Sequence, residues 1–174
     1  MHFSRLAAVL SALSLVSIGP VVAQTVVDAK GKFVGSLYEY GVDTQQVLRK
    51  VSSTVWIAFP VVVEGIRYTG HPIEYLYQTA DCSGVAYIDN DVNNLVQQAR
   101  FIPSDQDARW GTDGLLVYGG EMRIRMAIYS ARSKFNYNIG DGPCTSIPGE
   151  MRTVRMATEV SVKSLRLTAP FKLK

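Results

Sequence analysis

The sequence predicts an all-β protein, an antiparallel β-sandwich or barrel of about eight to ten strands. Two observations favour this class. Apolar residues recur with the two-residue period of half-buried strands in segment after segment. Glycine and other turn residues interrupt these segments at short intervals. A third observation agrees with them, because helical spacing of apolar residues occurs in one short stretch, residues 91–100, so we expect at most one short helix there.

The N-terminus has the organisation of a secretory signal. Arg5 precedes an uncharged apolar run over residues 6–19, and Val21 and Ala23 fit the small-residue rule for signal peptidase cleavage. The run is shorter than the ~20 apolar residues that a membrane-spanning helix needs. We therefore expect residues 1–23 to be a cleaved signal peptide, with no transmembrane segment in the mature chain. Residues 24–174 should form a single β-rich domain of a periplasmic or secreted protein.

The first half of the mature chain predicts four strands. Lys30-Gly31 is a compact turn signal and indicates a hairpin between the first two. The fourth, TVWIAFPVVV, is apolar on both faces and should be central. Pro60 within it cannot donate to a ladder, so we expect a bulge or a strand edge there. These predicted strands cover residues 25–29, 32–38, 46–51 and 54–63.

The second half continues in the same way. Gly119-Gly120 predicts another hairpin, and apolar residues alternate with polar ones after it, which indicates one core face and one solvated face. Near Lys163-Ser164 the apolar face changes from even-numbered to odd-numbered positions, which predicts a turn or bulge. Residues 91–100 favour either a short helix or a short strand within a loop. The other predicted strands cover residues 73–78, 85–89, 115–118 and 122–130.

Cys82 and Cys144 are the only cysteines, and they lie 62 positions apart. An even number of cysteines in an exported chain predicts a disulfide, which a loop of this length would make worth roughly 4 kcal/mol. Ser83-Gly84 after the first cysteine is typical of a turn. A free reactive thiol is the alternative, but neither cysteine has a histidine or cationic cluster beside it.

Catalytic residues are sparse. His71 is the only histidine after signal removal, and its Gly-His-Pro context is typical of a solvated loop. Asp105 and Asp107, near Trp110, are the best local candidates for the paired carboxylates of a glycosidase, but nothing places a second acid opposite them. The sequence therefore predicts no catalytic set and no cofactor.

A calcium loop is suggested by Asp89, Asp91 and Asn93, which match the first, third and fifth positions of an EF-hand. The match fails at Asn94, where glycine is required, and at Arg100, where a bidentate glutamate belongs. We therefore predict no metal site.

Tyrosine is the commonest aromatic residue, and a stacking platform for sugars is one interpretation. Tyr75 and Tyr77 share parity with Ile73, so they belong to a core-facing strand side. Tyr87 is a further platform candidate. The candidate ligand surface consists of Trp110, Tyr68 and His71.

Charge is unevenly distributed. Residues 25–120 contain seven basic and eleven acidic residues, whereas residues 121–174 contain ten basic and four acidic ones. A basic C-terminal third could meet anionic polysaccharide, lipid headgroups or nucleic acid. These charges alternate with apolar residues, however, which favours the solvated face of a sheet. We predict no nucleic-acid partner.

Three segments carry a resemblance, in the order VVDAKGKFVGSLYE, VWIAFPV and LYQTADCSGVAYID. They resemble a pattern of uncharacterised exported bacterial proteins and of the globular ends of some collagen-like or tail-fibre-like proteins. The resemblance covers about the first half of the mature chain and implies a β-rich, non-catalytic surface or tip domain. No collagen repeat is present. The matching residues are Asp28, Gly31 and Gly35, then Cys82, Gly84 and Tyr87.

Together these features predict an exported, non-enzymatic β domain that acts as a surface binding or structural module for an unknown protein or glycan partner. One alternative is a secreted hydrolase that uses Asp105 or Asp107 with His71. Another is an inhibitor or adhesin whose basic C-terminal strands contact an anionic partner.

Overall fold

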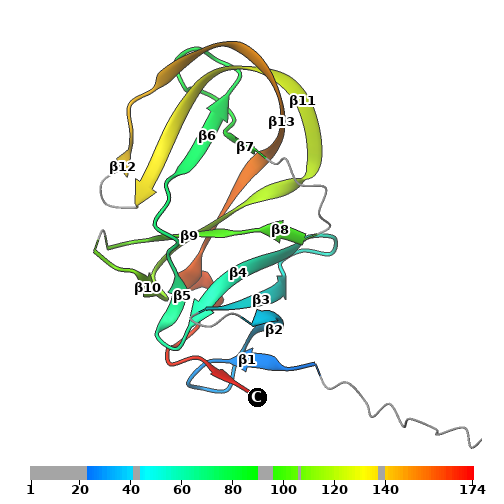
Figure 1. Ribbon diagram of the computed structural model, residues 1–174, viewed down its shortest axis with the longest axis vertical. Helices are drawn as coiled ribbons and strands as arrows, with labels where there is room; N and C mark the ends of the chain where they lie inside the picture. Colours follow the sequence, from blue (N-terminus) through cyan, green and yellow to red (C-terminus); the bar gives the residue numbers. More distant parts are fainter. Residues whose placement is uncertain (1–22, 41–43, 90–95, 106, 137–139) are drawn as a thin grey trace, which may run out of the picture.

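The computed structural model describes residues 23–40, 44–89, 96–105, 107–136 and 140–174. These residues form fourteen strands and one short 3-10 helix, arranged in two sheets whose pairings are antiparallel except for one parallel pair (Figure 1). The predicted all-β class is confirmed. The strands outnumber the expected eight to ten because several are only two or three residues long. The predicted signal peptide lies outside the described residues, except for Ala23.

The first sheet contains the N-terminal strands and the last strand of the chain. Its order is β10-β5-β4-β3-β2-β1-β14, and β8 pairs with β4 in parallel. The β1–β2 hairpin that Lys30-Gly31 predicts is present. The strands are β1 (Thr25–Val27), β2 (Phe33–Tyr40), β3 (Gln45–Lys50), β4 (Trp56–Val62), β5 (Gly65–Arg67), β8 (Val96–Gln98), β10 (Trp110–Gly111) and β14 (Lys172–Leu173).

The second sheet is dominated by two long strands that pair with each other over most of their length. β6 pairs with both β11 and β7, and β7 pairs with β13. Strands β11, β13, β7 and β6 are therefore hydrogen-bonded in a ring, and the sheet is strongly curled (Figure 1). The strands are β6 (Ile73–Tyr77), β7 (Tyr87–Asp89), β9 (Arg100–Pro103), β11 (Gly114–Asn136), β12 (Gly140–Asp141) and β13 (Thr145–Ser161).

The core confirms the predicted central strand. Ile57, Phe59 and Val61 of β4 are fully buried, while Trp56 remains 39% exposed. Pro60 lies between the residues of β4 that pair with β8 and those that pair with β5, so the described strands flank it on one side only. This is the strand edge expected for a proline without an amide hydrogen.

A second buried cluster contains the tyrosines expected in the core. Ile73, Tyr75 and Tyr77 pack with Cys82, and all four are less than 10% exposed. The basic C-terminal residues are less uniformly solvated than predicted, because Arg155 is 7% exposed.

The hairpin predicted at Gly119-Gly120 is wrong. β11 runs through both glycines, and its register with β13 shifts between Gly119 and Arg123. A Cβ atom at Gly119 would lie 2.8 Å from Cδ of Arg155. Glycine is therefore needed there for close packing against an arginine, not for chain reversal.

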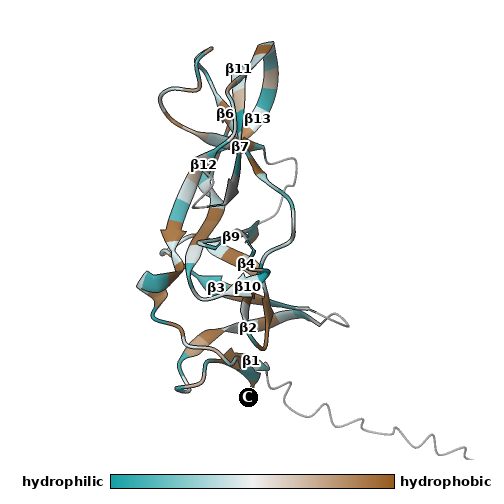
Figure 2. Ribbon diagram, turned by 90° about the vertical axis from the view of Figure 1, so that its left-hand side faces the viewer, coloured by the Kyte–Doolittle hydropathy of each residue, from teal (hydrophilic) through white to brown (hydrophobic). Residues whose placement is uncertain are grey.

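The polar and apolar residues of the long strands alternate as expected (Figure 2). The face predicted to enter the core does so only in part, however. Met126 and Ile128 are buried, but Met122 and Ile124 are 72% and 36% exposed. The buried cluster around Leu76 of β6 includes Met126 but not Met122 or Ile124. The apolar face of β11 therefore extends beyond the residues that bury it.

Two other predictions concern segments without long strands. The described part of residues 91–100 forms β8 and the start of β9, so the helical alternative is wrong there, while residues 91–95 lie outside the described residues. The turn predicted near Lys163-Ser164 is confirmed as the 3-10 helix Val162–Leu165.

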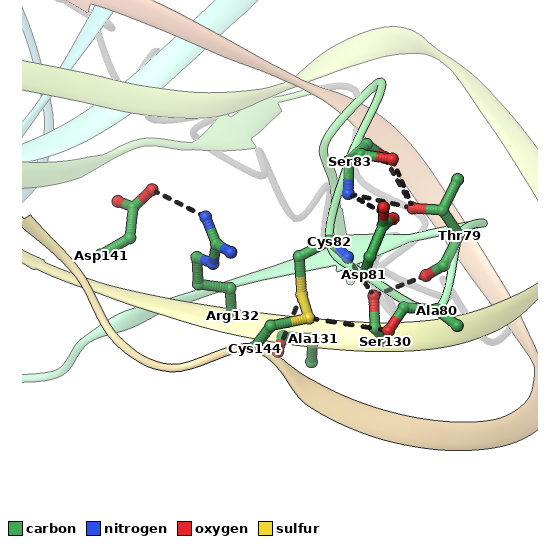
Figure 3. The surroundings of a disulfide bond; sticks show 10 residues. All are labelled: Thr79, Ala80, Asp81, Cys82, Ser83, Ser130, Ala131, Arg132, Asp141 and Cys144. Carbon is green, nitrogen blue, oxygen red and sulfur yellow. Dashed lines mark hydrogen bonds and ion pairs between the residues drawn. A yellow bond between two sulfur atoms is a disulfide. The ribbon is translucent and has the colours of Figure 1, made fainter.

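The predicted disulfide joins Cys82 to Cys144, with 5.8 Å between the Cα atoms. It connects the β6–β7 loop to the residue before β13 (Figure 3). The buried Ser130 hydroxyl of β11 accepts from the Cys82 amide at 3.1 Å and donates to the Thr79 carbonyl at 2.6 Å. The Ser83-Gly84 turn is present, with a φ of 85° at Gly84.

No helix in the described part of the chain is long and apolar enough to cross a membrane.

Candidate ligand-binding cleft

Two of the aromatic candidates, Tyr68 and Trp110, lie beside β5 and β10, whereas Tyr87 packs against the buried cluster of Leu76 and is not among the described lining residues. Two neighbouring hollows lie beside β5 and β10, a larger one of about 710 Å³, called the wide part, and a smaller one of about 380 Å³, called the narrow part, and both are lined by Arg67, Tyr68 and Thr69. We call both parts together the Tyr68 cleft. The wide part is also lined by Val62, Glu64, Gly70, Asp107, Ala108, Arg109 and Trp110. The narrow part is also lined by Thr44, Gln46, Pro60, Gln98, Ala99 and Arg100.

Backbone pairing between β5 and β10 positions the indole of Trp110. Trp110 pairs with Arg67, and the amide of Tyr68 donates to the carbonyl of Arg109 at 2.8 Å. Gly65 makes this approach possible, because a Cβ atom there would lie 2.7 Å from the carbonyl carbon of Gly111. Its φ of 143° also favours glycine. The cleft wall therefore depends on a glycine at the start of β5.

The side chains of Tyr68 and Trp110 differ in how far they pack against the core. Tyr68 is half-buried and packs against the main core cluster, so its ring is held in place. Trp110 is 46% exposed and presents its indole to solvent in the wide part. An anchored phenol beside an exposed indole provides an apolar surface on which a flat ligand face can stack.

Charge is divided between the two parts. The wide part contains the carboxylates of Glu64 and Asp107 and the guanidinium groups of Arg67 and Arg109. The narrow part contains Arg67 and Arg100, and its described lining residues include no carboxylate. Arg67 donates to the Thr44 hydroxyl, and Arg100 reaches the Pro72 carbonyl at 3.5 Å.

Gln46 adds an unusual polar atom to the narrow part. It pairs with Pro60 across β3 and β4, so both side chains lie on the same face of the sheet. The Gln46 Oε1 atom is enclosed, and within the described ranges no donor reaches it. A buried acceptor without a donor costs about 1–3 kcal/mol. Among the described residues, Gln46 therefore has a hydrogen-bond acceptor without a donor.

The other sequence candidates lie apart from the cleft or at its margin. His71 is exposed and lies one residue beyond Gly70, outside the described lining residues. Asp107 lines the wide part, whereas Asp105 accepts from the Asp107 amide at 3.1 Å and so shapes the loop. Serine, cysteine and histidine are not among the described lining residues.

The calcium candidates do not gather into a site in the described structure. Asp89 lies 3.7 Å from the Arg152 guanidinium, and Asp91 and Asn93 lie outside the described residues. In the part of the chain that is described, no group of three His, Cys, Asp or Glu residues could hold a metal ion.

Much of the C-terminal positive charge is paired. Arg152 contacts three carboxylates, those of Glu74, Asp89 and Glu150, at 2.7–3.7 Å. Lys134 contacts Glu159 at 2.7 Å. These pairs make the basic third of the sequence less cationic in the folded protein than its composition indicates.

No protein-family model, curated protein or solved structure matches this chain.

Sequence reasoning identified Tyr68 and Trp110 but missed Arg67, Arg100 and Gln46. The missed residues come from β5, β9 and β3, and only strand pairing brings them to one place. Pro60 was the one local signal. It is the cross-strand partner of Gln46, and a proline there predicts that no strand pairs with the other side of β4 at this position.

Proposed function

We propose that this chain is an exported, non-enzymatic β domain that binds a glycan in the Tyr68 cleft. The observation that carries the proposal is the exposed indole of Trp110, 46% accessible, beside the anchored ring of Tyr68 in an open hollow with a charged rim. Binding sites for small ligands combine apolar and aromatic walls with a few polar groups that fix orientation.

Sugars match this combination because each ring has an apolar C–H face and a polar hydroxyl edge. The C–H face stacks on an aromatic ring, and the hydroxyls reach side chains at the rim. Glu64 and Asp107 accept hydrogen bonds, Arg109 donates them, and Thr69 does both. A glycan therefore uses both kinds of surface at once.

Export is supported by two features. The N-terminal residues have the organisation of a signal peptide, and the Cys82–Cys144 disulfide persists in oxidising compartments. The glycan partner is then one of the periplasm, the cell surface or the medium.

Tryptophan fluorescence tests the proposal, because Trp56 and Trp110 are the only tryptophans. In a Trp56→Phe variant, Trp110 alone reports binding. We expect an oligosaccharide from a glycan panel to shift its emission, and Trp110→Ala to weaken binding at least tenfold in calorimetry. The matched control is Trp56→Ala, since Trp56 is similarly exposed but lies outside the cleft lining. A panel without any binding oligosaccharide, or full affinity in Trp110→Ala, contradicts the proposal.

Glycoside hydrolysis is the rival function, favoured by one observation. Glu64 and Asp107 line the same wide part, and glycosidases act through two carboxylates. Under our proposal, the bound oligosaccharide is recovered intact after prolonged incubation. Release of reducing ends that Asp107→Asn abolishes would establish the enzyme instead.

A further inference from the structure

The residue that follows the expected signal-peptidase cut lies at the start of the first sheet. Val21 and Ala23 place the cut after Ala23, so Gln24 becomes the first residue of the mature chain. In the structure Ala23 and Gln24 are exposed and precede β1, which begins at Thr25. The cleavage rule and the start of the sheet therefore point to the same peptide bond.

The main chain of Gln24 is already bound to the sheet. Its carbonyl accepts from the amide of Leu37 in β2 at 2.8 Å. At the next residue, the Thr25 amide donates to the Lys174 carbonyl at 3.2 Å, and the Lys174 amide donates to the Thr25 carbonyl at 2.8 Å. β1 thus lies between β2 and β14 (Figure 1). These hydrogen bonds hold the backbone of Gln24, while the residue itself is exposed.

An N-terminal glutamine has a reaction that most other N-terminal residues lack. Its α-amine reaches the Cδ carbon of its own side chain, and the two close an unstrained five-membered ring. The Nα–Cδ bond forms, the Cδ–Nε2 bond breaks, and one proton of the amine leaves with Nε2 as ammonia, which gives a pyroglutamyl lactam. The attacking amine has to be neutral, and α-amino groups, with ordinary pKa values of about 7.7–8.0, are partly neutral at neutral pH.

The folded chain is compatible with this reaction. The ring takes the α-amine and the side chain of Gln24, whereas the hydrogen bond from Leu37 uses the main-chain carbonyl, which the reaction leaves unchanged. Cyclisation therefore removes none of the contacts of β1 and requires no opening of the sheet. It does remove the positive charge of the terminus, which is the group that an aminopeptidase recognises.

Trimming from this end would damage β1. The strand is three residues long and joins β14 to the rest of the first sheet. Loss of Gln24 removes the acceptor for Leu37, and further loss of Thr25 removes both hydrogen bonds to Lys174. Chain termini are sites where proteolysis concentrates. A blocked terminus therefore protects the attachment of β14.

We infer that Gln24 is a modification site, and that the exported chain carries a pyroglutamyl residue at position 24, which blocks the terminus and preserves the outer hydrogen bonds of β1. This inference rests on the proposed export and is independent of the proposed glycan binding.

The test is mass spectrometry of the chain expressed with residues 1–174 in an exporting bacterial host and taken directly from the periplasm or medium. We expect the N-terminal peptide to begin at position 24 and to be lighter than its unmodified form by one molecule of ammonia. An amine-reactive reagent should label the lysine side chains but not residue 24.

Gln24→Asn is the matched variant, because it keeps a neutral amide but is one methylene too short to close the five-membered ring. We expect it to be cut at the same bond, to retain its amine, and to lose residues to an aminopeptidase at least tenfold faster than the parent protein. Pyroglutamyl peptidase, which removes only the lactam residue, should make the parent equally susceptible. Trimming that leaves the melting temperature of Gln24→Asn unchanged would overturn the protective role.

The remaining outcomes separate this inference from the proposed export. A chain that begins at Gln24 with a free amine overturns the modification and leaves export standing. A chain that begins at another residue overturns the modification and the position of the cut, and one that retains residues 1–23 overturns signal cleavage as well. Glycan binding is measured through Trp110, so its failure is recognised separately from each of these results.

Discussion

The backbone amide of Thr168 donates to Oδ2 of Asp28 at 3.0 Å, across 140 positions of sequence. The amides of Lys30 and Lys32 donate to the other carboxylate oxygen at 2.9 and 2.8 Å. Asp28 is completely buried. One carboxylate therefore caps the turn between β1 and β2 and holds the segment that leads into β14.

We expect Asp28 to make the free energy of unfolding decrease at acid pH. Burial raises the pKa of its carboxyl, but the amides of Lys32, Thr168 and Lys30 bind the ionised form and hold the pKa below its ordinary value. Since the unfolded value is about 3.9, the stabilisation is complete above that pH and is lost as the pH falls through the lower folded pKa. We expect Asp28→Asn to lower the free energy of unfolding at pH 7 and to flatten its decline below pH 4, as measured by urea denaturation. Glu39→Gln, an exposed carboxylate of β2, serves as the control; identical pH profiles for Asp28→Asn and the parent protein would contradict this role.

The disulfide should stabilise the protein substantially. Cys82 and Cys144 close a loop of 62 positions, for which the chain-entropy model gives about 4 kcal/mol. We therefore expect the double substitution Cys82→Ser, Cys144→Ser to lower the urea midpoint strongly. Reductant should do the same to the parent protein and have no effect on the double variant. A parent midpoint that reductant leaves unchanged while both thiols become alkylatable would show that the bond is dispensable.

Arg155 should stabilise the irregular part of β11. Its guanidinium donates to the carbonyls of Gly120 at 2.9 Å and of Glu121, in the stretch where the register shifts. Arg155→Met removes these donors from partly buried carbonyls, which we expect to cost about 1–3 kcal/mol in thermal or urea unfolding. Arg125→Met, at an exposed position of β11, should change stability by less than about 0.5 kcal/mol.

Gly119→Ala tests the same contact from the other strand. The new Cβ atom would lie 2.8 Å from Cδ and 3.0 Å from Cβ of Arg155, so the arginine has to move from its place. We expect a loss of stability of about 1–3 kcal/mol, which is typical of overpacking. In the double variant Gly119→Ala, Arg155→Met the two losses should not add, because both act on one contact. Simple additivity would contradict the packing role of Gly119.

Local pattern was sufficient for the class of the fold but not for its long-range pairing. The buried face of β4, the turn after Val162 and the tyrosines of β6 follow from residue period alone. The prediction of a hairpin at Gly119-Gly120 was wrong because two adjacent glycines can indicate either a turn or close packing against a buried side chain, and the local sequence is the same in both cases. The distinction depends on Arg155, which lies on another strand.

The cleft was predictable only in part, through its aromatic residues Trp110 and Tyr68 and the carboxylate of Asp107. Trp110 and Tyr68 stand out because large aromatic residues in short loop-flanked segments are candidates for ligand contact. Arg67 and Gln46 carry no such signal, since one belongs to a three-residue strand and the other to an ordinary one. Their meeting is a property of sheet order, which period and composition do not encode.

We expect the free energy of unfolding to decrease at alkaline pH because of a contact formed by Tyr75, Lys134 and Glu159. The Tyr75 hydroxyl donates to Glu159 Oε1 at 2.5 Å, and the Lys134 ammonium lies 2.7 Å from the same oxygen. Burial raises the pKa of Tyr75, and the hydrogen bond to Glu159 and its negative charge raise it further. The folded protein therefore holds the neutral phenol, whose stabilisation is complete below the unfolded pKa of about 10 and declines as the pH rises above it.

Tyr75→Phe separates this hydroxyl from the packing of its ring. We expect it to cost about 1 kcal/mol at pH 8, because it removes the hydrogen bond to Glu159, and to reduce the decline in stability between pH 9 and pH 11. The measurement is urea unfolding at three pH values, followed by far-ultraviolet circular dichroism. Tyr129→Phe, a 46% exposed tyrosine of β11, should reproduce the parent profile. A Tyr75→Phe profile as steep as that of the parent would assign the alkaline loss of stability to groups other than Tyr75.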